Sequence, residues 1–234
     1  NTAFIEGPPT VSRDGHWLIF NSDRPGGAGL NDLWVSYREN IHDRFGWERP
    51  FNLGGVNTPF QDQGASWFAN DDGLAPLLFF ASTRPGGPGL NDIYVAELLP
   101  DGYFAEASLV AELSSTSNDY RPSVRFDGLE LFFFSDRPGS FGFDLWVAVR
   151  DATTQPWRDP ANLGPTVNSD ANDQNPHITA DRRSLYFASN RPGAATRSAV
   201  VRFWKPQSAK TGAQKPVSQS LRYEFTVGDV IAVS

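Results

Sequence analysis

Apolar residues in this chain fall in short runs that share their length and composition. Four runs combine aromatic and aliphatic side chains, and they are Trp17–Phe20, Leu77–Phe80, Leu131–Phe134 and Leu185–Phe187. The polar dipeptide Asp-Gly, or Asp-Arg in the last case, precedes each run by a few residues. Runs this short that follow turn residues are typical of buried strands rather than helices. The pattern predicts an all-β protein with almost no helix.

The same turn sequence, containing Arg-Pro-Gly, follows each apolar run. Its four arginines are Arg24, Arg84, Arg137 and Arg191, and they lie 60, 53 and 54 residues apart. In the first three copies another strand follows, marked by Asp-Leu-Trp-Val or by the variant at Asp92–Val95. A four-stranded propeller blade repeats every ~40–50 residues, close to these spacings.

We therefore expect a β-propeller with four sequence-visible four-stranded blades. Their predicted extents are about residues 1–56, 57–113, 114–167 and 168–204. Residues 205–234 differ, since they hold the first lysines of the chain, and we expect a linker followed by C-terminal strands. These strands either complete the last blade or form a partial fifth blade. A ring left open by one chain exposes strand edges, so a homo-oligomer is a further expectation.

Composition limits the classes of function. The formal net charge is −7 and the sequence pI is about 4.9, which argues against binding to nucleic acid phosphates. The chain has no cysteine, so disulfides, thiol nucleophiles and cysteine metal sites are excluded. No apolar run approaches the ~18 residues of a membrane-spanning helix, so we expect no membrane insertion. The first residue is Asn1 rather than methionine, which fits a processed and exported protein.

Four acidic residues recur just before the first strand of each repeat and are the candidate catalytic residues. They are Glu6, Asp62, Asp119 and Asp173, and we call them the acid positions. The symmetry of a ring brings them toward its axis, where crowded carboxylates suit a general acid beside an ionised partner. Carboxylates also suit calcium, so this cofactor is compatible with the sequence. In the structural alternative, each carboxylate caps a local turn or pairs with a neighbouring blade.

Other residues near the acid positions are candidates for binding a ligand. Trp67 and Tyr120 lie at positions where the repeats differ, as expected for a specific site at a symmetric mouth, and Gln63, Gln174 and His177 lie near the same mouth. Aromatic faces beside amides and carboxylates are a composition found in sugar sites, and also in ordinary loops.

A second set of aspartates, Asp32, Asp92 and Asp144, begins the third strand of the first three repeats. We interpret these residues as architectural. An arginine fork from the preceding Arg-Pro-Gly turn is expected to bridge to each carboxylate and hold the turn against its strand.

The recurring turns, strands and Arg-Pro-Gly strings resemble the WD-like β-propeller repeats of exported bacterial proteins, such as the propeller of the Tol–Pal system. The resemblance covers residues 1 to about 200. It implies a propeller fold and a periplasmic or extracellular location, and it says little about function, because such propellers carry many activities.

Two functions are therefore open. In the first, a non-enzymatic propeller of the bacterial envelope or exterior recognises a glycan or a protein partner at its central mouth. In the second, the chain is similar to five-bladed glycosidase propellers, and two acid positions act as a glycoside hydrolase pair. Such a pair needs about 5–5.5 Å between carboxyls for retention, or about 6.5–9.5 Å for inversion.

Overall fold

A computed structural model describes residues 2–71, 73–192, 198–203 and 227–228. Its strands form four antiparallel four-stranded sheets, each a simple meander in sequence order. The first blade contains β1 (Thr10–Val11), β2 (Trp17–Ser22), β3 (Asp32–Tyr37) and β4 (Phe51–Asn52). The second contains β5 (Asp62–Phe68), β6 (Leu77–Ser82), β7 (Asp92–Glu97) and β8 (Ser108–Leu109). A 3-10 turn, η1 (Gly54–Val56), is the one helical element among the described residues.

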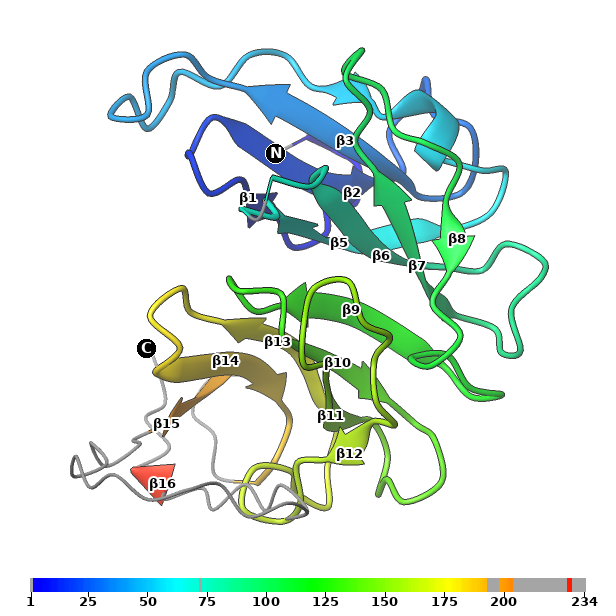
Figure 1. Ribbon diagram of the computed structural model, residues 1–234, viewed down its shortest axis with the longest axis vertical. Helices are drawn as coiled ribbons and strands as arrows, with labels where there is room; N and C mark the ends of the chain where they lie inside the picture. The colour runs from blue at the N-terminus through cyan, green and yellow to red at the C-terminus, as the bar shows by residue number, and fades with distance from the viewer. Residues whose placement is uncertain (1, 72, 193–197, 204–226, 229–234) are drawn as a thin grey trace.

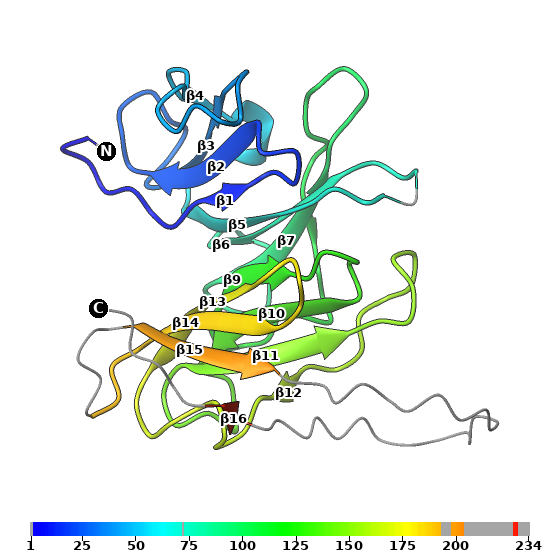
Figure 2. The ribbon, with the colours of Figure 1, turned by 90° about the vertical axis from the view of Figure 1, so that its left-hand side faces the viewer.

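The other two blades have the same plan. The third contains β9 (Asp119–Val124), β10 (Glu130–Ser135), β11 (Asp144–Val149) and β12 (Ala161–Asn162). The fourth contains β13 (Asp173–Ile178), β14 (Ser184–Ser189), β15 (Ser198–Phe203) and β16 (Val227–Gly228). The blades follow one another around a centre (Figure 1), and β1, β5, β9 and β13 lie in succession near the middle of the side view (Figure 2).

The apolar runs found in the sequence form the second strands, and they pack the blades against each other. Side chains alternate between the two faces of a strand, so one strand serves two interfaces. In β10, Phe133 belongs to the core shared with the second blade, whereas Phe132 and Phe134 belong to the core shared with the fourth. A third core joins the first and second blades around Leu78 and Phe80. These three apolar interfaces hold the four blades in order.

The first strands of blades two to four carry a β-bulge at the same place. The pairing of each with its neighbour is interrupted after Gln63, after Tyr120 and after Gln174. The bulged backbone has positive φ at Gly64 (65°), Arg121 (48°) and Asn175 (56°). Glycine and, less readily, asparagine adopt this conformation, so a half-buried arginine there is unusual. The bulge turns these residues toward the centre of the ring.

The fold prediction is confirmed: the protein is all-β and built of four four-stranded blades. Of the two expectations for the C-terminal segment, the first holds for its described part, because β16 pairs with β15 as the outer strand of the fourth blade. The rest of residues 205–226 and 229–234 lies outside the described residues. Among described residues no apolar core joins the fourth blade to the first, and Figure 1 shows the ring open there. In the described ranges, no helix has the length and apolar character needed to span a membrane.

Candidate functional site

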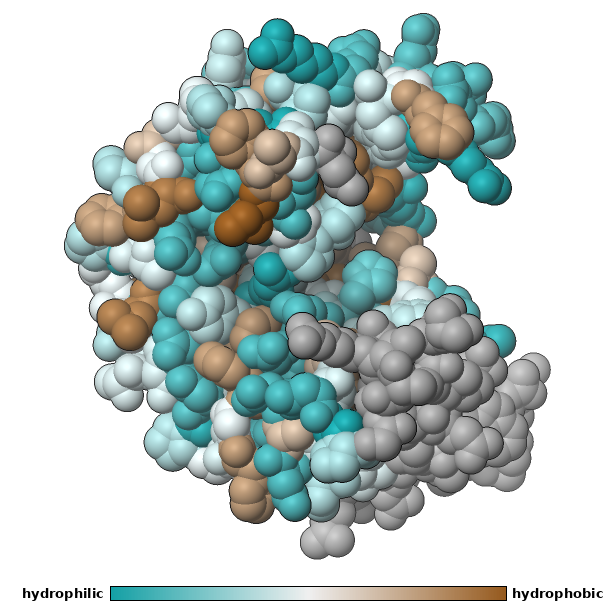
Figure 3. Space-filling view, turned by 180° about the vertical axis from the view of Figure 1, so that it is seen from behind, coloured by the Kyte–Doolittle hydropathy of each residue, from teal (hydrophilic) through white to brown (hydrophobic). Residues whose placement is uncertain are grey.

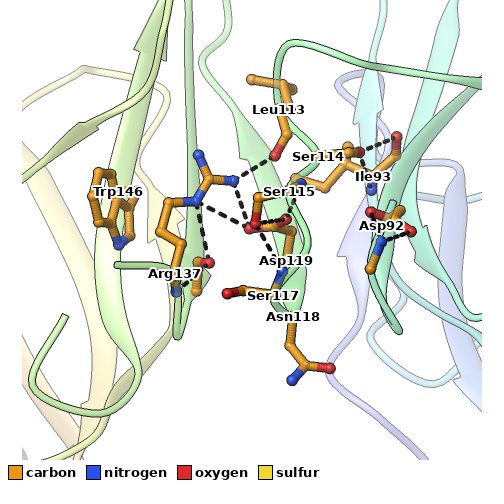
Figure 4. Close-up of polar contacts among 12 residues, drawn as sticks. Asp92, Ile93, Leu113, Ser114, Ser115, Ser117, Asn118, Asp119, Arg137 and Trp146 are labelled. Carbon is orange, nitrogen blue, oxygen red and sulfur yellow. Dashed lines mark hydrogen bonds and ion pairs between the residues drawn. The ribbon is translucent and has the colours of Figure 1, made fainter. Parts of the chain in front are cut away.

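The acid position of the third blade is sealed inside its own blade. Asp119 has no exposed surface, and its Oδ1 accepts hydrogen bonds from Arg137 at 3.2 Å (Nε) and 2.5 Å (Nη2). Its Oδ2 accepts from the backbone N–H and the hydroxyl of Ser115 at 2.6 and 2.8 Å. Arg137 also donates to the carbonyl of Leu113 at 2.7 Å, and Figure 4 shows this closed network.

The same arrangement occurs in two further blades. Asp62 pairs with Arg84 at 2.7 Å, and Asp173 pairs with Arg191 at 2.6 Å. Both aspartates have no exposed surface, and each accepts two bonds from a Thr or Ser four residues earlier. We call the pairs Asp62–Arg84, Asp119–Arg137 and Asp173–Arg191 the latches. Their carboxylates are saturated by protein donors and have no surface on which to meet a substrate.

Glu6, the acid position of the first blade, is a weaker version of a latch. It pairs with Arg24 at 3.1 Å, and both side chains are 15% exposed. Hydrogen bonds from Thr2 lower the pKa of Glu6 below its ordinary value. The structure thus places each candidate catalytic carboxylate against its own Arg-Pro-Gly turn, as the structural alternative describes.

The expected bridge from the turn arginine to the third-strand aspartate is wrong. The arginines reach the first strand instead, and the third-strand aspartates accept bonds from other groups. Asp92 accepts from the N–H of Gly89, and Asp144 accepts from the amide of Asn162 at 2.8 Å. Burial raises the pKa of both carboxyls, because no arginine compensates their charge. They hold the turn through its backbone rather than through a salt bridge.

No calcium centre is evident in the described residues, where no group of three or more His, Asp or Glu side chains could hold a metal ion. The side-chain oxygens of Asn168 and Asn172 near the fourth acid position accept the backbone N–H groups of Leu145 and Phe143, respectively. These oxygens are therefore occupied by hydrogen bonds within the protein.

A cavity of about 110 Å³ lies where the four first strands meet. Each blade lines it with three consecutive residues, beginning two places after its acid position. They are Pro8-Pro9-Thr10, Gly64-Ala65-Ser66, Arg121-Pro122-Ser123 and Asn175-Pro176-His177, and the space they enclose is the axial cavity. This volume accommodates several water molecules or a small polar group. None of the lining residues is acidic.

Hydroxyl groups of the lining connect neighbouring blades. Ser66 of the second blade accepts the N–H of Val124 in the third at 3.0 Å. Ser123 of the third blade accepts the N–H of Ile178 in the fourth at 3.2 Å. In the fourth blade the equivalent residue is His177, an exposed side chain on the cavity wall. Desolvation by the surrounding protein lowers the pKa of His177, which favours a neutral imidazole at pH 7.

The residues directly after the acid positions form an amide and phenol rim. The Nε2 of Gln63 donates to Asn91 at 3.2 Å, and Asn91 donates to the hydroxyl of Tyr120 at 2.8 Å. The Tyr120 ring stacks on Phe134 with centroids 5.1 Å apart. Gln174 occupies the equivalent half-buried position in β13. Three of the predicted binding residues therefore occupy one equivalent strand position outside the lining of the axial cavity, and His177 of the predicted set lines the cavity itself.

Trp67 does not belong to this group. It packs against the core between the first and second blades, and its ring meets Phe104 edge-on with centroids 6.2 Å apart. Its role as a ligand-binding residue at the mouth is not supported, because its indole is held within the fold.

The sequence interpretation missed Arg121 and Gly64 of the cavity lining. Each stands two places after an acid position, where the four repeats have proline, glycine, arginine and asparagine. The four repeats have four different residues at this position, and this variation is the sequence signal that identifies it. Figure 3 shows a notch that opens at the right-hand edge of the molecule at mid-height, with both hydrophilic and hydrophobic side chains near it.

No protein-family model matches the sequence, and no curated protein matches it either. Solved structures do match its fold. A thermostable family-43 glycoside hydrolase is 10% identical with a TM-score of 0.59, over 91% of this chain and 77% of that one. The arabinanase Arb43A of Bacillus subtilis is 13% identical with a TM-score of 0.56, over 83% and 71%. TolB of Acinetobacter baumannii is 13% identical with a TM-score of 0.55, over 86% and 41%.

These likenesses show the propeller fold and leave the function open, because all three identities are low. The chain spans less than half the length of the TolB chain that it matches.

Proposed function

We propose that the chain is a non-catalytic, glycan-binding β-propeller of the bacterial periplasm or exterior, and that the axial cavity with its rim is the binding site. The observation that carries the proposal is the lining of the axial cavity. Four symmetric positions hold four different sets of side chains, and they offer hydrogen-bond donors and acceptors without a carboxylate. Concave sites with a few convergent polar groups are typical ligand sites.

The rim adds groups suited to sugar hydroxyls. Gln63 and Tyr120 are half-buried and are joined through the buried side chain of Asn91, so that amides and a phenol form one hydrogen-bonded line. A sugar offers many hydroxyls that both donate and accept, which matches the dual capacity of side-chain amides. Glycan binding therefore uses the groups present better than a purely apolar protein contact would.

The alternative function is a glycoside hydrolase, which the arabinanase and family-43 likenesses favour. Hydrolysis needs two carboxyls facing the scissile bond. The three latch aspartates have no exposed surface, and no acidic residue lines the axial cavity. These two facts favour binding over hydrolysis.

The test combines a binding panel and a turnover panel. We expect purified protein to bind one or more glycans of a broad array and to release no aryl leaving group from matched chromogenic glycosides. His177→Ala removes an exposed cavity side chain and should weaken glycan binding about tenfold, the loss of one favourable polar contact. His42→Ala, at an exposed loop position, is the matched control and should leave affinity unchanged.

Three results would count against the proposal. Turnover of a glycoside would establish the hydrolase instead. If His177→Ala and His42→Ala changed glycan affinity equally, the binding site would lie outside the axial cavity. Absence of any glycan binding would overturn the function itself.

A further inference from the structure

Arg121 differs from the other buried arginines of the chain. Arg84, Arg137 and Arg191 are each neutralised in a latch, and Arg150 donates to the carbonyl of Gly128 at 2.6 Å and stacks over Trp157. The guanidinium of Arg121 makes no hydrogen bond or ion pair with any described residue. Its nitrogens are also not among the fully buried polar atoms that lack a partner, so solvent or a ligand can reach the charge.

The fold makes room for this side chain on the cavity wall. A Cβ placed on Gly64, at the equivalent bulge of the second blade, would lie 2.5 Å from Cγ and 3.3 Å from Cβ of Arg121. Because Gly64 has no side chain, the aliphatic part of the Arg121 side chain can pack against the second blade. Arg121 also keeps a left-handed φ of 48°, a conformation that disfavours it. An unfavourable backbone and an unpaired charge coincide in one residue, and such outliers cluster at binding sites.

The electrostatics of the axial cavity fit a single negative charge. No carboxylate lines the cavity, and burial alone lowers the pKa of Arg121 to about 10, which leaves the guanidinium charged at neutral pH. His177 is the one other titratable residue of the lining, and its lowered pKa favours the neutral form. One cation in a small space matches a monovalent carboxylate better than a phosphate dianion.

We propose that the axial cavity binds the carboxylate of an acidic sugar, with the guanidinium of Arg121 as its counter-ion. This inference rests on the proposed glycan-binding function and names the class of glycan. A guanidinium offers two parallel N–H groups to a carboxylate, which fixes the orientation of the ligand as well as its charge. Asn175, Ser66 and Ser123 line the same space and supply polar groups near the sugar ring.

The variant that tests this is Arg121→Asn, because the chain itself places asparagine at the equivalent bulge of the fourth blade. Asn175 has a φ of 56°, so asparagine suits this backbone conformation. The matched control is Arg182→Asn. Arg182 also has a positive φ, 62°, but its side chain is 53% exposed and pairs with Asp127 at 3.1 Å. Both variants remove one positive charge, so a difference between them reports position rather than net charge.

The measurement is an NMR titration of glucuronate and galacturonate beside glucose, galactose and acetate. We expect the uronates to bind wild-type protein at least tenfold more tightly than the neutral sugars and acetate. Arg121→Asn should abolish this preference while its Tm is no lower than that of the wild type. Arg182→Asn should preserve the preference.

The other outcomes separate this inference from the proposed function. Neutral sugars that bind as tightly as uronates, in wild type and in Arg121→Asn alike, would overturn the acidic-sugar assignment and leave glycan binding intact. Acetate that binds as tightly as the uronates would show a site for simple carboxylates and would also overturn it. Failure of every sugar and anion to bind would overturn both proposals.

Discussion

The latch aspartates and the cavity-lining residues begin two places apart on the same strands. The latch residues are nearly the same from blade to blade, whereas the lining residues differ. Three blades have the same aspartate, the same arginine partner and the same Ser or Thr donor four residues before the aspartate. Two places further on, the four blades have Pro8, Gly64, Arg121 and Asn175. Because the latch recurs in three blades and in a weaker form in the first, we interpret it as the contact that holds the long turn of each blade. A feature that changes from blade to blade breaks the symmetry, and a specific ligand requires such a break.

Breaking a latch should have the largest effect on stability. Asp119→Asn leaves Arg137, whose side chain is 11% exposed, without its counter-charge. Removal of one partner from a buried ion pair costs about 3–5 kcal/mol of unfolding free energy, which should be measured by denaturant unfolding. The control is Asp159→Asn, an exposed aspartate of the same blade, which should change stability by less than about 0.5 kcal/mol. Equal stability of the two variants would show that the latches are not structural.

The hydroxyl connections between blades should have an intermediate effect. Ser123→Ala leaves the buried N–H of Ile178 without its acceptor, and an unpaired buried group costs about 1–3 kcal/mol. Ser66→Ala removes the corresponding bond between the second and third blades and should cost a similar amount. Ser117→Ala is the control, because the hydroxyl of Ser117 has no hydrogen-bond partner within the described ranges. Thermal unfolding in which all three variants match the wild type would contradict this role.

The sequence predicted the features that repeat. Strand runs, turns and the Arg-Pro-Gly period predicted the blades, and alignment of the repeats predicted the equivalence of Glu6, Asp62, Asp119 and Asp173. The β-bulges are the local feature that the sequence did not predict. The bulge between Gln63 and Ser66 inserts a residue and changes the alternation of faces, so Trp67 points into the core rather than toward the mouth. Positive φ at Arg121 and Asn175 has no composition signal, because neither is glycine.

The carboxylate partner of each turn arginine also could not be predicted from the sequence. Asp62 and Asp92 end up on two strands that both pair with β6, directly opposite the same serine, Ser82. The two aspartates are equivalent candidates for Arg84 until the side chains are placed. Only the structure shows that Asp62 receives the salt bridge.

The smallest expected change in unfolding free energy is a gain rather than a loss. It tests the comparison between the latches and the cavity lining most directly. Arg121→Gly gives the third blade the residue that the second blade has at its bulge, where Gly64 has a φ of 65°. It relieves a left-handed conformation that costs a non-glycine residue about 1–2 kcal/mol and removes an unpaired guanidinium, while the greater freedom of glycine in the unfolded chain offsets about 0.5–1 kcal/mol. We expect denaturant unfolding to show a gain of about 1 kcal/mol, together with loss of uronate binding. A latch substitution that destabilises and a cavity substitution that stabilises, two residues apart, would separate architecture from recognition. A destabilised Arg121→Gly would mean that the arginine packs for the sake of the fold.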